Sequence, residues 1–175
     1  MSAEAIAEEF EKILMEVEVE FQNSLDELIL VRDLQKLNLP GAALEKLTAG
    51  MKLKIFRWAS EKLVEKELAR RPEELLDPKT IRQLCWKERN NPAELQPLPR
   101  YFYLMARGLR DSSNILPELK DIFALRFNKI VSYAAKRVPE GMLENLTAEE
   151  QALYRSLSSI IQTWFKFIEI GDENR

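Results

Sequence analysis

The spacing of apolar residues changes along this chain. Over residues 3–14 apolar side chains recur every three or four positions, which predicts a short amphipathic helix. From residue 17 the period becomes two, since Val17, Val19 and Phe21 alternate with glutamates, and this predicts a half-buried strand at residues 17–21. Further elements are predicted at residues 28–31 (strand), 42–47 (a helical turn) and 53–55 (strand). The first part of the chain therefore predicts a small β-rich module.

The rest of the chain carries helical periodicity. Asp77 before Pro78 is a typical helix start, and Thr147 followed three residues later by Glu150 predicts a capping box. Five helices are predicted, at residues 56–68, 78–89, 101–109, 117–137 and 147–168. The predicted fold class is mainly α, with a small N-terminal β-rich module followed by a five-helix domain.

Charge is unevenly distributed about Gly50. Residues 1–50 carry 11 acidic and 4 basic side chains, whereas residues 51–175 carry 18 acidic and 22 basic ones. This shift predicts a β-rich domain with a short N-terminal helix at residues 1–50, a helical domain at 51–170 and a tail at 171–175. The basic surplus of the second part is too dilute to predict more than weak or absent direct DNA binding.

Composition limits the available chemistry. The 175 residues include no histidine, one cysteine (Cys85), and five glycines that lack the spacing of a phosphate-binding loop. We therefore predict no catalytic residue, no cofactor and no metal site. No apolar run is long enough to span a membrane and no secretory signal is visible, so a cytoplasmic location is expected.

The charged residues that suggest a site have simpler explanations. Glu149 and Glu150 are adjacent carboxylates, but they lie in a first helical turn, where acids favour the helix dipole. Five basic residues can be interpreted as a phosphate-binding face or as ion-pair partners of Glu88, Glu94 and Asp111 within the chain. The second interpretation is favoured. The five residues are Lys87, Arg89, Arg100, Arg107 and Arg110.

Residues 81–114 predict a rigid elbow between two helices. Pro97 and Pro99 restrict the backbone before a new helix, and Tyr101 and Tyr103 are candidates for holding the elbow in place.

The last helix is apolar on more than one side. Trp164 and Phe165 on this helix, together with Phe127 on the preceding one, are candidate subunit-interface residues, because wide aromatic surfaces favour interfaces. From the residues alone, a buried central helix explains the pattern equally well.

The order of these segments resembles the GINS family, subunits of the replication complex that accompanies the MCM helicase. The resemblance covers residues 17–164 and is strongest to the smaller archaeal subunit, the counterpart of the eukaryotic Psf-two and Psf-three, with its β domain first and helical domain second. It rests on VEVEF, ELILV, LKIFRWASEKL, WKERNNPAELQPLPRYFYLMARGL, IFALRFNKIVSYA and ENLTAEEQALY.

The resemblance implies a non-enzymatic scaffold at the nucleoid-associated replication fork. It implies assembly with a larger GINS subunit into a two-plus-two tetramer, and links to the MCM helicase and a RecJ-like fork factor. Two alternatives remain open from the sequence. One is a small all-helical enzyme that acts on an anionic metabolite through Arg, Lys and Glu residues, and the other is a helical nucleic-acid-binding module.

Overall fold

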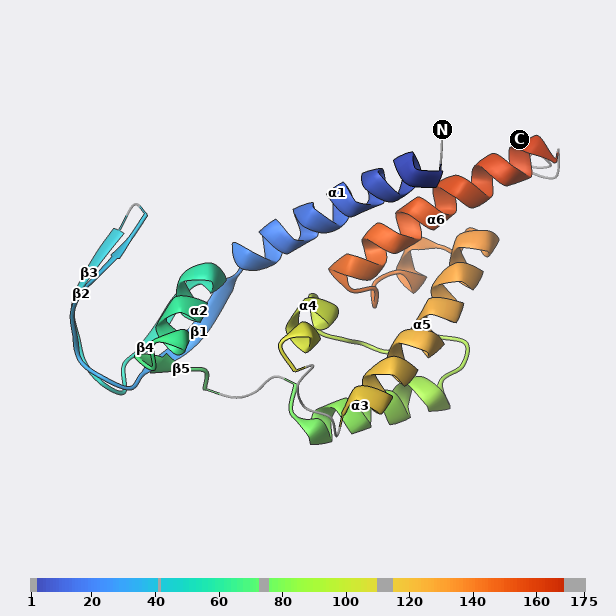
Figure 1. Ribbon diagram of the computed structural model, residues 1–175. Helices are drawn as coiled ribbons and strands as arrows, with labels where there is room; N and C mark the ends of the chain where they lie inside the picture. Colours follow the sequence, from blue (N-terminus) through green and yellow to red (C-terminus); the bar gives the residue numbers. More distant parts are fainter. Residues whose placement is uncertain (1–2, 41, 73–75, 110–114, 169–175) are drawn as a thin grey trace. The chain divides into compact units, whose positions relative to one another are not determined.

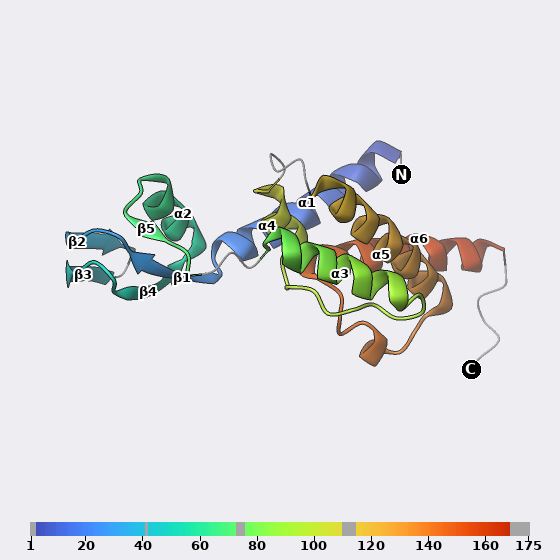
Figure 2. The same ribbon diagram turned by 90° about the horizontal axis from the view of Figure 1, so that it is seen from below.

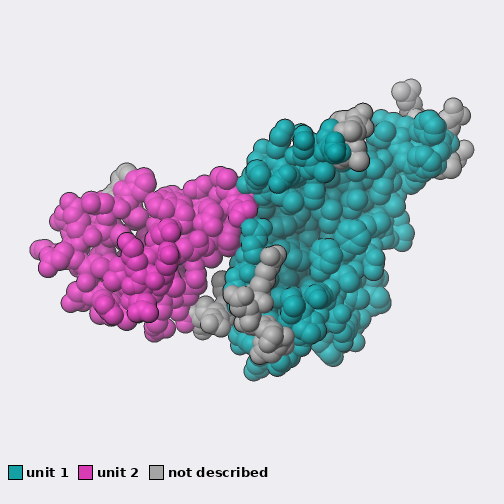
Figure 3. Space-filling model, in the orientation of Figure 1, with its two compact units in different colours: residues 1–17, 76–175 teal, residues 18–75 magenta. Residues whose placement is uncertain are grey.

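The computed structural model describes residues 3–40, 42–72, 76–109 and 115–168. These residues contain six α-helices and five strands, which confirms the predicted fold class, mainly α with a small β-rich module near the N-terminus. They form two compact units (Figure 3). Unit 1 comprises Met1–Val17 and Leu76–Arg175, and unit 2 comprises Glu18–Leu75.

Unit 2 is built on strand β1 (Figure 1). β1 (Leu25–Leu30) lies between β4 (Lys52–Phe56) and β5 (Ala69–Arg70), and both neighbours are antiparallel to it. Alternate β1 side chains are buried, as the two-residue period of a strand requires, and α2 (Arg57–Glu65) packs on them. A second, two-stranded sheet pairs β2 (Leu34–Leu39) with β3 (Ala42–Leu47).

Two local predictions in this region are wrong. Residues 17–21 form no strand and instead lie in helix α1 (Ala3–Gln22), because the alternation there is part of a longer helical stripe that runs from Phe10 to Phe21. Residues 42–47, predicted as a helical turn, form strand β3, which is fixed by its antiparallel pairing with β2. Tertiary pairing thus overrode a short local pattern.

Unit 1 contains the long helices. They are α3 (Pro78–Asn90), α4 (Phe102–Arg107), α5 (Leu116–Lys136) and α6 (Ala148–Phe167), with the short 3-10 helix η1 (Glu140–Met142) before α6 and the first part of α1 alongside. α5 packs against α3 and α6, and Figure 2 shows α3 beside it. The predicted start signals are confirmed: Asp77 accepts a hydrogen bond from the Thr80 backbone N–H at 2.6 Å, and Thr147 and Glu150 form a capping box.

The predicted boundary at Gly50 falls inside unit 2. Gly50 has φ of 85°, a left-handed conformation that suits glycine, and it lies in the turn between β3 and β4. Since β1 pairs with β4 across this position, residues on both sides of Gly50 belong to one folded unit. Helix α2 lies in unit 2 as well, while unit 1 gains the first part of α1. The predicted tail at 171–175 lies outside the described residues.

Candidate functional site: a buried ionic network and an apolar surface

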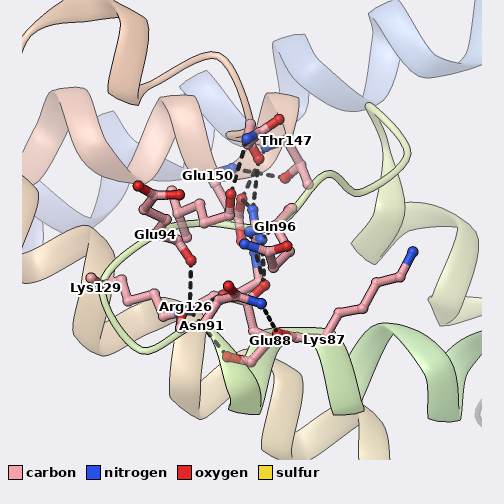
Figure 4. Close-up of polar contacts among 12 residues, drawn as sticks. Lys87, Glu88, Asn91, Glu94, Gln96, Arg126, Lys129, Thr147 and Glu150 are labelled. Atoms are coloured by element: carbon pink, nitrogen blue, oxygen red, sulfur yellow. Dashed lines mark hydrogen bonds and ion pairs between the residues drawn. The ribbon is translucent and has the colours of Figure 1, made fainter.

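An ionic network lies in the interior of unit 1, between α3, α5 and α6 (Figure 4). At its centre the Arg126 side chain of α5 has 0% exposure. Its Nε and Nη2 each donate to one carboxylate oxygen of Glu150 at 2.6 Å, and its Nη1 donates to Glu88 at 3.0 Å. Burial alone would lower the pKa of Arg126, but the hydrogen bonds and charge of Glu150 raise it, so the guanidinium stays charged.

Lys129 extends this network by one helical turn. Its ammonium donates to the second carboxylate oxygen of Glu88 at 2.5 Å, and to the backbone carbonyls of Asn91 at 2.6 Å and Glu94 at 2.8 Å. Two buried cations therefore face two buried carboxylates. Because every charge has an opposite partner, the desolvation cost of burying them is offset within the unit.

Arg126 and two neighbouring side chains hold the elbow segment, residues 91–100. Arg126 donates to the Gln96 carbonyl at 2.7 Å, Tyr133 donates its hydroxyl to the Ala93 carbonyl at 2.8 Å, and Asn145 donates to the Leu95 carbonyl at 2.9 Å. The segment has no helix or strand of its own to satisfy these carbonyls. Side chains of α5 and of the segment before α6 therefore set its path.

The residues predicted to hold the elbow lie at its end. Pro97 and Pro99 lie within the segment, and Tyr101 precedes α4 with the guanidinium of Arg100 5.4 Å from its ring centre. Tyr103 donates its hydroxyl to Glu150 at 2.6 Å and meets the ring of Phe102 edge-on. Burial and the Glu150 charge raise the pKa of Tyr103, so it is a neutral donor. Tyr103 thus joins the elbow to the ionic network.

The two adjacent glutamates of α6 have different roles. Glu150 completes the capping box and also binds Arg126, which the sequence pattern did not indicate. Glu149 accepts a hydrogen bond from the Leu104 backbone N–H at 3.0 Å, which satisfies a donor in the first turn of α4. Burial raises the pKa of Glu149. Both carboxylates serve structure here.

Three of the five predicted basic residues have separate surroundings. Arg89 pairs with Asp121 of α5, Arg100 lies over Tyr101, and Lys87 extends away from the buried network in Figure 4. Arg110 and Asp111 lie outside the described residues. Instead of binding one of these arginines, Glu88 binds Arg126 and Lys129. The sequence did carry a signal for these two, because they share a helix face with the buried Ile122, Ile130 and Tyr133.

Phe127 lines an apolar hollow at the surface of unit 1. Its ring stacks on that of Phe123, with 5.8 Å between the ring centres, and both side chains are partly exposed. Phe10 of α1 and Leu153 of α6 also line this hollow, which has a volume of about 340 Å³. Helix α1 therefore lies near α5 and α6 without filling the space between them.

The C-terminal half of α6 is also apolar and exposed. Trp164 is 57% exposed and stacks on Phe167, which is 78% exposed, while Phe165 is half-buried. Figures 1 and 2 show this end of α6 running beyond α5. A second hollow of about 430 Å³ lies between α1 and α6, with Ile13 and Ile160 among its lining residues. These features are typical of a surface that binds another protein.

The exposed apolar surface of α5 and α6 suits the binding of another protein. Within the described parts of the chain, no three His, Cys, Asp or Glu side chains are grouped to hold a metal ion. A search of the same residues finds no helix long and apolar enough to cross a membrane. The buried carboxylates Glu88 and Glu150 are already bound to cations.

Comparison with known protein families shows which family the chain belongs to. Residues 75–168 match the family model described as Sld5, the GINS complex protein helical bundle domain. This match covers more than half of the chain, so the chain belongs to the GINS family, whose members are non-enzymatic scaffold subunits of a hetero-oligomeric DNA replication complex. A search of curated proteins found no match. The small-enzyme alternative is not favoured.

Proposed function

We propose that this chain is the smaller, archaeal type of GINS subunit, with its β-rich unit before most of its helical unit. It assembles with a larger GINS subunit, in a two-plus-two tetramer, and links the MCM helicase to other fork factors, including a RecJ-like protein. The family match to residues 75–168 and the position of the strands at residues 25–70 support this proposal.

A single observation supports assembly most directly: the helical unit leaves aromatic side chains exposed on α5 and α6. Trp164 and Phe127 are both partly exposed, and the hollows beside α1 are lined by apolar residues. A soluble protein rarely keeps such a surface without a partner, because each exposed apolar area costs solvation free energy. We infer that the helical domain of a second GINS subunit covers this surface.

The test is the mass of the assembly. We expect the chain co-expressed with a larger-type GINS subunit to elute as one species, with a light-scattering mass equal to two copies of each. Two separate elution peaks at all concentrations would reject the proposed partnership. A stable complex of another stoichiometry would reject only the tetramer.

The same proposal includes the absence of intrinsic catalysis and of strong DNA binding. The purified chain is expected to show no nucleotide turnover and only weak retention on DNA. When the chain is isolated from cells, replication-fork proteins of the nucleoid are expected to co-purify with it. Nucleotide hydrolysis that follows the purified chain through successive columns would contradict this part of the proposal.

A further inference from the structure

The outer face of α3 has an unusual combination of residues. The inner face carries Ile81, Cys85 and Glu88, all buried. The outer face carries Trp86, which is 67% exposed, and around it a set of polar side chains at helical spacing: Lys79, Arg82, Gln83 and Lys87. Lys79, Arg82, Gln83 and Trp86 line a hollow of about 300 Å³.

Hydrogen-bond donors dominate this face. Lysine, arginine and the indole N–H can only donate, and glutamine alone can also accept. The one carboxylate within α3, Glu88, points inward and binds Arg126 and Lys129. Asp77, just before the helix, accepts from the Thr80 N–H. The outer face therefore presents positive charge and donors around an apolar ring.

Helix α5 compensates only part of this charge. Glu118 pairs with Arg82 at 3.3 Å, and Asp121 pairs with Arg89. The charge of Lys79 acts on Asp77, but neither Lys79 nor Lys87 has a carboxylate within ion-pair distance among the described residues. They are eight positions apart, about 12 Å along the helix axis, and Trp86 lies between them in sequence. This spacing suits two separate carboxylates on one bound segment.

We propose that the outer face of α3 binds an acidic segment of a partner protein, which places a large apolar side chain beside Trp86 and carboxylates against Lys79 and Lys87. Charge complementarity selects this partner. Single-stranded nucleic acid shares the negative charge, but its binding proteins usually offer a longer positive groove with several stacking rings. This face offers one exposed indole and two lysines that form no ion pair with the described residues.

The surface is independent of the proposed subunit assembly. The assembly proposal uses residues of α1, α5 and α6, whereas this inference uses α3. Failure of one test therefore leaves the other unaffected.

The experiment measures binding of a fluorescein-labelled acidic peptide to the full chain by fluorescence anisotropy. The peptide consists of glutamate and aspartate residues around one central phenylalanine. A second peptide replaces that phenylalanine with serine, and a labelled oligothymidylate represents single-stranded DNA. We expect saturable binding of the phenylalanine peptide, weaker binding of the serine peptide, and a loss of affinity as ionic strength rises.

Two variants and a matched control locate the site. Trp86→Ala is expected to weaken binding about thirtyfold, as for an aromatic hot spot. The double variant Lys79→Glu/Lys87→Glu is expected to weaken it about tenfold or more. The control, Lys54→Glu/Lys66→Glu, makes the same charge change at exposed positions of unit 2 and is expected to bind as the unaltered chain does. Circular dichroism confirms that each variant is folded.

Each remaining outcome overturns the proposal. Absence of saturable peptide binding rejects it, as does binding that Trp86→Ala and the double variant leave unchanged. Tighter binding of the oligothymidylate than of the peptide, lost in the same variants, would assign the face to nucleic acid. Self-association of the chain that disappears in Trp86→Ala, without peptide binding, would assign it to a second copy.

Discussion

Arg126 and Glu150 form a two-point ion pair in the interior of the helical unit, with Nε and Nη2 of the arginine each 2.6 Å from a different carboxylate oxygen. Glu150 also accepts from the Thr147 backbone N–H at 2.9 Å, and so begins α6. One carboxylate therefore fixes both the start of α6 and its position against α5. The helices that carry the proposed interface depend on this pair for their geometry.

Loss of the Arg126 guanidinium is expected to destabilise the fold strongly. In Arg126→Met, Lys129 still faces Glu88, but Glu150 is left buried without a cation. We expect the free energy of unfolding to fall by about 3–5 kcal/mol, as for other broken buried ion pairs. Urea denaturation measures this. Arg155→Met, at an exposed position of α6, is the control and should change the value by no more than about 0.5 kcal/mol. A loss in Arg126→Met as small as in the control would show that the network contributes little.

The sequence indicated some of this architecture and missed the rest for physical reasons. The starts at Asp77 and Thr147 were predictable because capping depends on local residues. Strand β3 was not, because six residues of mixed character acquire their conformation only from β2. Arg126 was missed because a charge on a helix is usually exposed, and only its position among buried apolar neighbours reveals it.

Glu149 provides a prediction about pH. Burial raises the pKa of its carboxyl above its ordinary value, so the folded chain favours the protonated form more than the unfolded chain does. Its contribution to stability is therefore full below the unfolded pKa and is lost as pH rises through the folded pKa. Glu149→Gln keeps an acceptor for the Leu104 N–H and carries no charge. We expect this variant to be more stable than the unaltered chain at neutral pH, with the difference shrinking as pH falls through the folded pKa and gone below the unfolded pKa.

The measurement for Glu149 is urea denaturation of both proteins at neutral and acidic pH. Glu144→Gln, an exposed position shortly before α6, is the matched control. Equal stability of Glu149→Gln and the unaltered chain at every pH would show that the charged form is not disfavoured.

Asp26 is expected to stabilise unit 2 selectively. This buried carboxylate of β1 accepts hydrogen bonds from Ser60 at 2.6 Å and from Arg71 at 3.1 Å, and it pairs with Arg57 at 3.4 Å. Asp26→Asn removes the charge that these arginines face, and we expect a loss of about 2 kcal/mol. Hydrogen exchange should show weaker protection of β1 and α2, with α5 unchanged. Equal loss of protection in α5 would mean that the two units unfold together.

Glu27→Gln is the control for Asp26→Asn. Glu27 is on the same strand, but its ion pair with Lys52 is exposed, and such pairs contribute less than about 1 kcal/mol. Protection of β1 in this variant should match that of the unaltered chain.

The apolar surface of α5 and α6 gives the last prediction. Trp164→Ala and Phe127→Ala should weaken assembly with a larger GINS subunit, by about thirtyfold for the tryptophan. Trp164→Ala should leave the thermal midpoint of the isolated chain nearly unchanged, because the side chain is mostly exposed, whereas Phe127→Ala should lower it modestly, because the ring stacks on Phe123. Phe165→Asp should also weaken assembly, but its half-buried ring makes some loss of chain stability an expected part of the result.

Trp58→Ala, at a partly exposed tryptophan of unit 2, is the control and should assemble normally. Binding is measured by titration of the labelled subunit, and folding by thermal melts of each variant alone. If Trp164→Ala and Phe127→Ala both assemble with unaltered affinity, or if they melt far below the unaltered chain in isolation, these aromatics belong to the internal packing of the subunit and not to its interface.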